Sequence, residues 1–190
     1  AMTAAKVAAP YGTWSSPITA GMIADTTISL SSVQVDGNDI YWLEGRPSEG
    51  GRVVLVKRTD AGPVDVLPSG YSARSRVHEY GGGAAIVSGG VVFFVRFEDQ
   101  RIYRLKDGGV PEAITPDTGD RHADMFHDVL RNRLVCVRER HVDDAVLNEL
   151  ITVDLDTGVC KVLVEGHDFV SVSYTQLRAH ETREDREFRG

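Results

Sequence analysis

A pattern of four short strand-like segments occurs three times in this sequence, with a period of just under fifty residues. The third segment of each copy is centred on Val54, Tyr103 and Ile151, which are 49 and 48 residues apart. Pro68 and Pro116, which end the fourth segment of the first two copies, are 48 residues apart. Strands that repeat in this way are typical of propeller blades, although WD-type repeats have only about 40 to 45 residues. An immunoglobulin-like sandwich would explain the strands but not the similarity between copies. We therefore predict an all-β fold, a β-propeller.

Gly, Asn, Asp and Pro separate the apolar segments, as expected for strands joined by tight turns. Gly37 and the pair at 89–90 lie between the first two segments of their copies, where glycine allows a positive φ in a hairpin. Asn132 takes this place in the third copy. We expect these divisions of the chain: an N-terminal loop and short helix (the helix over 18–24) in 1–25; a propeller region in 26–171, with four-stranded blades at about 26–69, 76–117 and 122–166; and a tail in 172–190.

Three blades do not close a ring, because propellers have about 4 to 8. An open stack of three sheets would leave the faces of its two end blades uncovered. We therefore expect the chain to be a truncated part of a longer protein, whose complete propeller would have about six to eight blades.

Charge and hydropathy exclude two classes of partner. The chain has 21 Lys and Arg residues against 28 Asp and Glu residues, a net charge of −7, whereas nucleic-acid binding needs clustered basic residues. The longest apolar run, at 91–95, is too short to cross a bilayer, and the N-terminus lacks the pattern of a secretory signal. We expect a cytoplasmic protein that binds neither nucleic acid nor membrane.

Several large or reactive side chains have a plain structural interpretation. Trp42, Phe93, Phe94 and Tyr103 are expected in the core between blades, whereas Trp14 is not assigned to it. Cys136 and Cys160 have no C-x-x-C spacing, so we favour two free buried thiols. A disulfide between them stays open, because the sequence gives no distance.

One motif points to a family. The run Arg-Ser-Arg-Val-His-Glu-Tyr-Gly-Gly-Gly at 74–83, together with residues 10–20, resembles the propeller domain of S9-family serine peptidases. These are the prolyl-oligopeptidase-like enzymes that include acylaminoacyl-peptidases and dipeptidyl aminopeptidases. Residues 41–47, 99–104 and 165–169 carry further resemblance, so that it extends from about Pro10 to about Val170.

The resemblance implies a TolB-like propeller next to an α/β-hydrolase domain in cis, with a Ser-Asp-His triad and no cofactor. The sequence contains no G-x-S-x-G, the elbow that exposes the nucleophile in such hydrolases. We therefore expect this chain to hydrolyse nothing by itself, and to act as a filter that admits short peptides to the catalytic domain. The alternative is a stand-alone propeller of the TolB type that serves as a protein-interaction scaffold.

Five residues of the motif are candidates for the substrate cleft or the contact with the hydrolase domain: Arg74, Arg76, His78, Glu79 and Tyr80. Arg and carboxylate groups suit the charged ends of peptides. The alternative is that these residues hold one blade to the next. Residues 81–83 do not suit a phosphate loop, because no Lys-Ser/Thr follows and the next segment is a strand. A close backbone approach near the propeller axis explains the three glycines better.

A metal site is not expected. Four neighbouring residues offer ligand atoms: His122, Asp124, His127 and Asp128. Regular strand geometry would place the first two on one face and His127 on the other. A metal-dependent hydrolase propeller would need acidic and Asn ligands from several blades, and it stays a third alternative.

The end of the chain does not continue the repeat. Residues 172–182 resemble a translated transposase-type sequencing adapter, and residues 183–190 are charged and without apolar alternation. We expect residues from about Val172 onward to be non-native.

Overall fold

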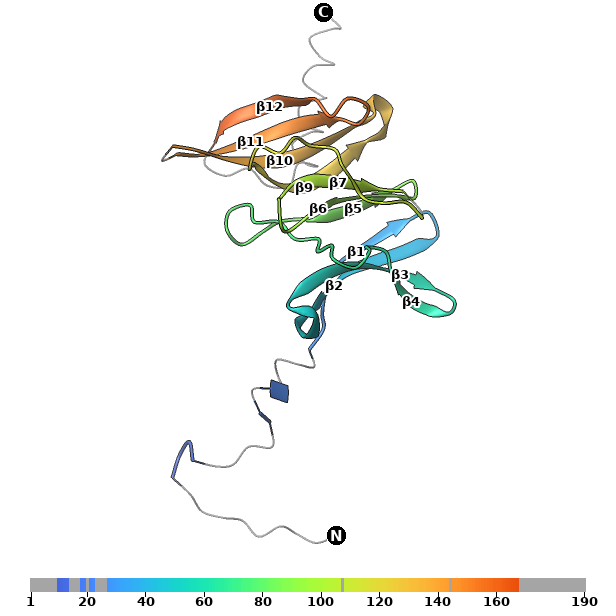
Figure 1. Ribbon diagram of the computed structural model, residues 1–190, viewed down its shortest axis with the longest axis vertical. Coiled ribbons are helices and arrows are strands. Elements are labelled where there is room, and N and C mark those ends of the chain that lie inside the picture. Colours follow the sequence, from blue (N-terminus) through green and yellow to red (C-terminus); the bar gives the residue numbers. More distant parts are fainter. Residues whose placement is uncertain are drawn as a thin grey trace, which may run out of the picture.

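Three four-stranded antiparallel sheets follow one another along the chain in the computed structural model (Figure 1). The structure describes residues 10–13, 18–19, 21–22, 27–106, 108–143 and 145–167. The strands are β1 (Ser29–Asp36), β2 (Asp39–Arg46), β3 (Arg52–Thr59), β4 (Gly62–Asp65), β5 (Ala85–Ser88), β6 (Val91–Val95), β7 (Ile102–Leu105), β8 (Glu112–Ala113), β9 (Arg121–Asp128), β10 (Arg133–Val142), β11 (Ala145–Asp154) and β12 (Cys160–His167). Two 3-10 helices, η1 (Pro47–Glu49) and η2 (Val129–Arg131), lie in turns, and no helix in the described ranges is long and apolar enough to cross a membrane.

Each sheet is a meander in which every strand pairs with the next one in sequence. The orders are β1-β2-β3-β4 in blade 1, β5-β6-β7-β8 in blade 2, and β9-β10-β11-β12 in blade 3. The first strands lie side by side, since β5 contacts both β1 and β9. Sheets stacked with their first strands adjacent are propeller blades. The predicted all-β propeller fold is confirmed, with three blades in the described part of the chain.

Side chains from the inner strand of blade 1 bind the backbone of blade 2. The Gln34 amide donates to the carbonyl oxygen of Ala85 at 2.9 Å and accepts the N–H of Val87 at 3.0 Å. The carboxylate of Asp36 accepts the N–H groups of Gly89 and Gly90 at 2.9 and 2.6 Å. These four bonds, here called the inner clip, fix the position of β1 relative to β5 and the turn after it.

Apolar layers fill the spaces between blades. Successive strand residues point to opposite faces, so that Phe94 packs with Leu55 of blade 1, whereas Phe93 packs with Leu134 and Ile151 of blade 3. These side chains are at most 2% exposed. Burial of one such side chain contributes roughly 1.5–3 kcal/mol, so the layers hold the stack together.

The predicted aromatic core is largely as expected. Phe93, Phe94 and Tyr103 are buried, whereas Trp42 is only half-buried against the layer between blades 1 and 2. Its indole N–H donates to Glu44 at 2.9 Å, which explains why the ring lies at the margin. Trp14 lies outside the described residues.

Both cysteines are free thiols. Cys136 is buried, as predicted, and burial raises its pKa. Cys160 is half-buried rather than buried, because it opens the outermost strand of blade 3.

The outer strands of blades 1 and 2 are shorter than the segments predicted for them. The fourth segments, expected over 63–68 and 110–116, form β4 and the two-residue β8. Proline has no N–H for the ladder, and Pro68, Pro111 and Pro116 lie in these segments. Of the helix predicted over 18–24, residues 21 and 22 are helical and the others described, 18 and 19, are not. The rest of that helix and the tail at 172–190 lie outside the described residues.

The turns that join the first two strands of each blade match expectation. Gly37, Gly89 and Gly90 have φ of 61°, 59° and 76°, and Asn132 has φ of 48° as the C-cap of η2. Strand β9 carries a bulge that the sequence did not predict. Its register against β10 shifts between Val135 and Val137, and Asp124 there has φ of 52°.

Candidate functional site

Residues 74–83 connect blade 1 to blade 2 and also reach blade 3. The N–H of Arg74 donates to the carbonyl oxygen of Val95 in β6 at 3.1 Å. The Ser75 hydroxyl donates to the carbonyl oxygen of His122 in β9 at 2.7 Å. The motif therefore lies across the seam between blades 2 and 3.

Gln100 holds the first part of the motif in place. This side chain is 5% exposed and lies in the turn after β6. Its Oε1 accepts the N–H of Arg76 at 2.7 Å, and its Nε2 donates to the carbonyl oxygens of Arg74 and Phe97 at 3.2 and 2.8 Å. The His122 Nδ1–H bonds the carbonyl oxygen of Gln100 at 2.9 Å. The buried amide thus fixes the backbone that carries Arg74, Arg76 and Phe97.

The two arginines share one aromatic ring. The Cζ atoms of Arg74 and Arg76 lie 5.1 and 4.3 Å from the ring centroid of Phe97, a geometry that favours cation–π attraction. Both side chains are exposed. Neither guanidinium forms an ion pair with a residue in the described part of the chain.

The second half of the motif binds a buried carboxylate of blade 3. Glu139 is 2% exposed, and its Oε2 accepts the N–H of His78 at 2.6 Å. Its Oε1 accepts from Arg121 at 3.0 Å and lies 2.8 Å from Nε2 of His141. Arg121 also donates to Glu79 at 2.6 Å, which lowers the pKa of that carboxyl group. A buried carboxylate is tolerated only when it is paired in this way, so this network ties blade 2 to blade 3.

The backbone at His78 and Glu79 is strained. Their φ values are 55° and 64°, the left-handed region that costs non-glycine residues about 1–3 kcal/mol each. The contacts with Glu139 and Arg121 offset this cost. Tyr80 is 79% exposed, with its ring centroid 5.7 Å from that of His78. Of the five predicted site residues, His78 and Glu79 thus contact blade 3, as does the carbonyl oxygen of Arg76, which accepts from Arg121 at 3.1 Å. The side chains of Arg74, Arg76 and Tyr80 are exposed. Contact of any of the five with substrate stays a prediction.

The glycines that end the motif permit close packing. A Cβ at Gly82 would lie 2.9 Å from Cβ of Ala123, and one at Gly83 would lie 3.0 Å from Oδ1 of Asp124. Oδ1 of Asp124 accepts the N–H of Gly83 at 2.6 Å. Because β9 is the first strand of blade 3, this is the close backbone approach that the sequence favoured over a phosphate loop.

The histidines of β9 do not form a metal site. His122 is buried and bonds Gln100, and His127 Nδ1 lies 2.9 Å from Oγ of Ser88. Both rings therefore point toward blade 2. The prediction that they lie on opposite faces is wrong, because the bulge at Asp124 shifts the alternation by one residue. Asp128 caps η2 by accepting the N–H of Arg131.

One group in the described residues has metal-ligand spacing. The ligand atoms of Glu79, Glu139 and His141 lie within 4.8 Å of one another. Arg121 already donates to both carboxylates, so their negative charge is offset by the chain itself. We assign no metal to this group.

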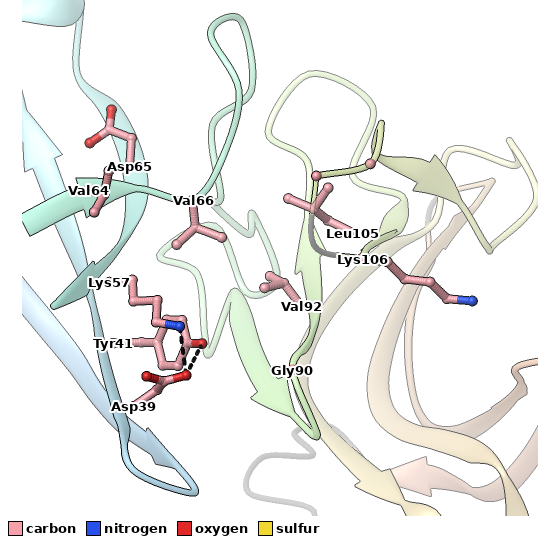
Figure 2. Close-up of a pocket in the computed structure, with 12 residues that line it drawn as sticks. Asp39, Tyr41, Lys57, Val64, Asp65, Val66, Gly90, Val92, Leu105 and Lys106 are labelled. Atoms are coloured by element: carbon pink, nitrogen blue, oxygen red, sulfur yellow. Dashed lines mark hydrogen bonds and ion pairs between the residues drawn. The ribbon is translucent and has the colours of Figure 1, made fainter. Parts of the chain in front are cut away.

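A pocket of about 550 Å³ lies between blades 1 and 2, away from the motif. Figure 2 shows Asp39, Tyr41 and Lys57 on the blade 1 side, and Val92 and Leu105 on the blade 2 side. Lys57 donates to Asp39 at 2.6 Å. These polar groups satisfy one another, which makes the pocket a gap at the outer part of the seam rather than a site that demands a ligand.

Sequence reasoning named the five motif residues but not the partners that position them. Phe97, Gln100, Arg121 and Glu139 are distant in sequence from the motif, and only Gln100 lay in a stretch that carried family resemblance. No local pattern marks such partners.

No protein-family model and no curated protein matches this sequence. Solved structures do match it. A puromycin-hydrolysing peptidase from Mycobacterium tuberculosis is 31% identical with a TM-score of 0.77, over 88% of this chain and 29% of that chain. A puromycin hydrolase is 31% identical with a TM-score of 0.74, over 85% and 28%. A variant of puromycin hydrolase in complex with PGG is 32% identical with a TM-score of 0.74, again over 85% and 28%. The chain thus spans less than a third of the length of these proteins.

Proposed function

We propose that this chain, whose fold is that of the propeller of S9-family, prolyl-oligopeptidase-like peptidases, is the substrate-gating part of a serine peptidase that hydrolyses short peptides. The observation that carries the proposal is the match of nearly the whole chain, in fold and in sequence, to peptidases that hydrolyse puromycin. In this proposal the chemistry belongs to an α/β-hydrolase domain in cis, because the sequence has no G-x-S-x-G elbow. The propeller admits peptides and excludes folded proteins.

An uncovered blade face supports a larger propeller. Strand β1 exposes Leu30, Val33 and Val35 to 68%, 73% and 68%. Contiguous exposed apolar side chains indicate a surface that another element covers, and in a propeller that element is a neighbouring blade. We therefore include in the proposal that further blades complete the ring around this truncated, non-catalytic part.

The proposal extends to specificity and location. We expect the activity of an acylaminoacyl-peptidase or a dipeptidyl aminopeptidase, in the cytoplasm. The test is to sequence the locus from single DNA molecules and express its complete product. We expect the reading frame to lead through further blades into a strand–turn–helix with G-x-S-x-G.

A fluorophosphonate probe, which labels activated serines, should label that product, and this chain alone should remain unlabelled. Acetylalanyl and dipeptidyl p-nitroanilides would then separate the two activities. A locus that ends after a closed ring without an elbow, with no labelled product, would contradict the peptidase and favour the TolB-like scaffold.

A further inference from the structure

Four arginines of the described residues form no ion pair, and two of these, Arg74 and Arg76, lie against the same aromatic ring. Nine arginines of the described residues form ion pairs with carboxylates: Arg46, Arg52, Arg96, Arg104, Arg121, Arg131, Arg133, Arg138 and Arg140. Arg74 and Arg76 have none, although the chain carries 28 acidic residues and a net charge of −7. In an acidic chain, two adjacent cations without an acid partner require an explanation.

The pair is held in place by buried groups. All three hydrogen bonds of the Gln100 side chain go to the backbone of Arg74, Arg76 and Phe97. Gln100 itself has φ of 58°, a left-handed conformation that is costly outside glycine. A buried amide and a strained backbone thus hold two like charges against one ring. Such prior ordering lowers the entropy cost of binding an anion between or beside them.

We propose that Arg74, Arg76 and Phe97 form a subsite for the carboxylate of a peptide. Guanidinium groups bind carboxylates through paired N–H···O bonds, and the ring of Phe97 limits the conformations that the two side chains must give up. The inference rests on the proposed function in one respect, which is that the ligand is a peptide.

The surrounding charges favour a singly charged anion. Glu79 lies three residues beyond Arg76, and its lowered pKa, due mainly to Arg121 and in small part to Arg76, keeps it ionised. A fixed negative charge near the subsite opposes a phosphate dianion more than a carboxylate. A nucleic-acid backbone would meet the same opposition, together with the overall charge of the chain.

The test is a titration of the whole 190-residue chain with three peptides, followed by NMR on the arginine Nε–H and Gln100 amide signals. The peptides are acetyl-trialanine with a free carboxylate, the same peptide as its amide, and acetyl-Ala-Glu-Ala amide. The first and third peptides separate a C-terminal from a side-chain carboxylate. We expect at least one of them to bind, the blocked trialanine amide to bind about tenfold more weakly or not at all, and affinity to fall between about 0.02 and 0.5 M salt.

Variants distinguish the subsite from general charge. The double variant R74Q/R76Q should lose about tenfold or more in carboxylate affinity. The matched control is R58Q, since Arg58 is also exposed and forms no ion pair with a described residue, and it should bind as the wild type does. R74K/R76K keeps the charge but not the planar fork, so it should bind more weakly than the wild type and more tightly than R74Q/R76Q. All these side chains are exposed, so their replacement leaves the core unchanged.

Failure of both carboxylate peptides to bind, trialanine amide that binds as tightly as they do, or equal loss in R58Q would overturn the proposal. Inorganic phosphate that binds more tightly than the peptides would overturn it in favour of a phosphate site. The serine labelling described above is independent of this titration. A chain that binds carboxylates while the complete product carries no reactive serine would leave the subsite standing and the peptidase assignment wrong.

Discussion

At the scale of single residues, Glu139 is a buried point at which the motif and blade 3 meet. The carboxylate is 2% exposed and bonds the backbone of His78 as well as the side chains of Arg121 and His141. None of these partners could be deduced from the sequence, because nothing local links position 78 to position 139. One of the contacts across the seam between blades 2 and 3 therefore rests on an acidic group that resembles a surface residue in the sequence.

The variant E139Q tests this dependence. Glutamine keeps the shape of the side chain but presents an NH₂ group to one of the donors, so a buried hydrogen bond is lost. We expect the free energy of unfolding to fall by about 1–3 kcal/mol, measured by urea denaturation. The control is E112Q, whose wild-type side chain is 68% exposed in a pair with Arg104, and which should change stability by less than about 0.5 kcal/mol. A similar change in both variants would contradict the role of Glu139.

His122 gives the fold a dependence on pH. Burial lowers its pKa below the ordinary value of 6.5, so the folded state binds fewer protons than the unfolded state just below that value. Unfolding free energy is therefore unaffected by this group above pH 6.5 and falls as the pH drops below it. Denaturation at about pH 7.5 and pH 5.5 should show the loss, and H122Q should reduce it. A variant with the same pH dependence as the wild type would assign the effect to other groups.

At the scale of strands, the sequence predicted which strands exist better than it predicted the residues at which they begin and end. Short apolar segments separated by turn residues identified all four strands of each blade, because burial on both faces and tight turns each leave a local pattern. The bulge in β9 left no local pattern in the sequence. It depends on the contact of Ala123 and Asp124 with Gly82 and Gly83, which are about forty residues away in the chain. As a consequence, His127 was predicted on the face opposite to His122, whereas both rings point toward blade 2.

The contact between Gly82 and Ala123 can be tested by a double-mutant cycle. G82A should destabilise the chain by about 1–3 kcal/mol, because its new Cβ would lie 2.9 Å from Cβ of Ala123. A123G removes that methyl group, so the double variant G82A/A123G should be more stable than the sum of the single changes predicts. Thermal and urea denaturation of the four proteins measure the coupling. Additive effects would show that the two residues do not constrain each other.

At the scale of the whole molecule, the repeat predicted the architecture because each blade buries its faces only against its neighbours. The layers between blades 1 and 2 and between blades 2 and 3 are closed by such packing. By contrast, no blade packs on the face of blade 1 that carries Leu30, Val33 and Val35, and these side chains are exposed in the described structure. The site was less predictable than the fold, since it is assembled across a seam rather than along a strand.

This uncovered face predicts self-association. The chain should form larger species as its concentration rises, measured by sedimentation velocity, and L30K/V33K/V35K should shift it toward the monomer. The control is L130K, because Leu130 is 95% exposed but lies in η2 of blade 3 and not on this face. If both variants behave alike, general charge rather than this face controls association.

The inner clip should make the seam between blades 1 and 2 open about its inner strands, β1 and β5. Gln34 and Asp36 hold the inner strands at four points, whereas the pocket at the same seam is lined by β2, β3, β4, β6, β7 and adjoining turns. Any breathing of these two blades would widen their outer ends first and keep β1 and β5 together. The inner strands would separate only after the four bonds of the inner clip had broken.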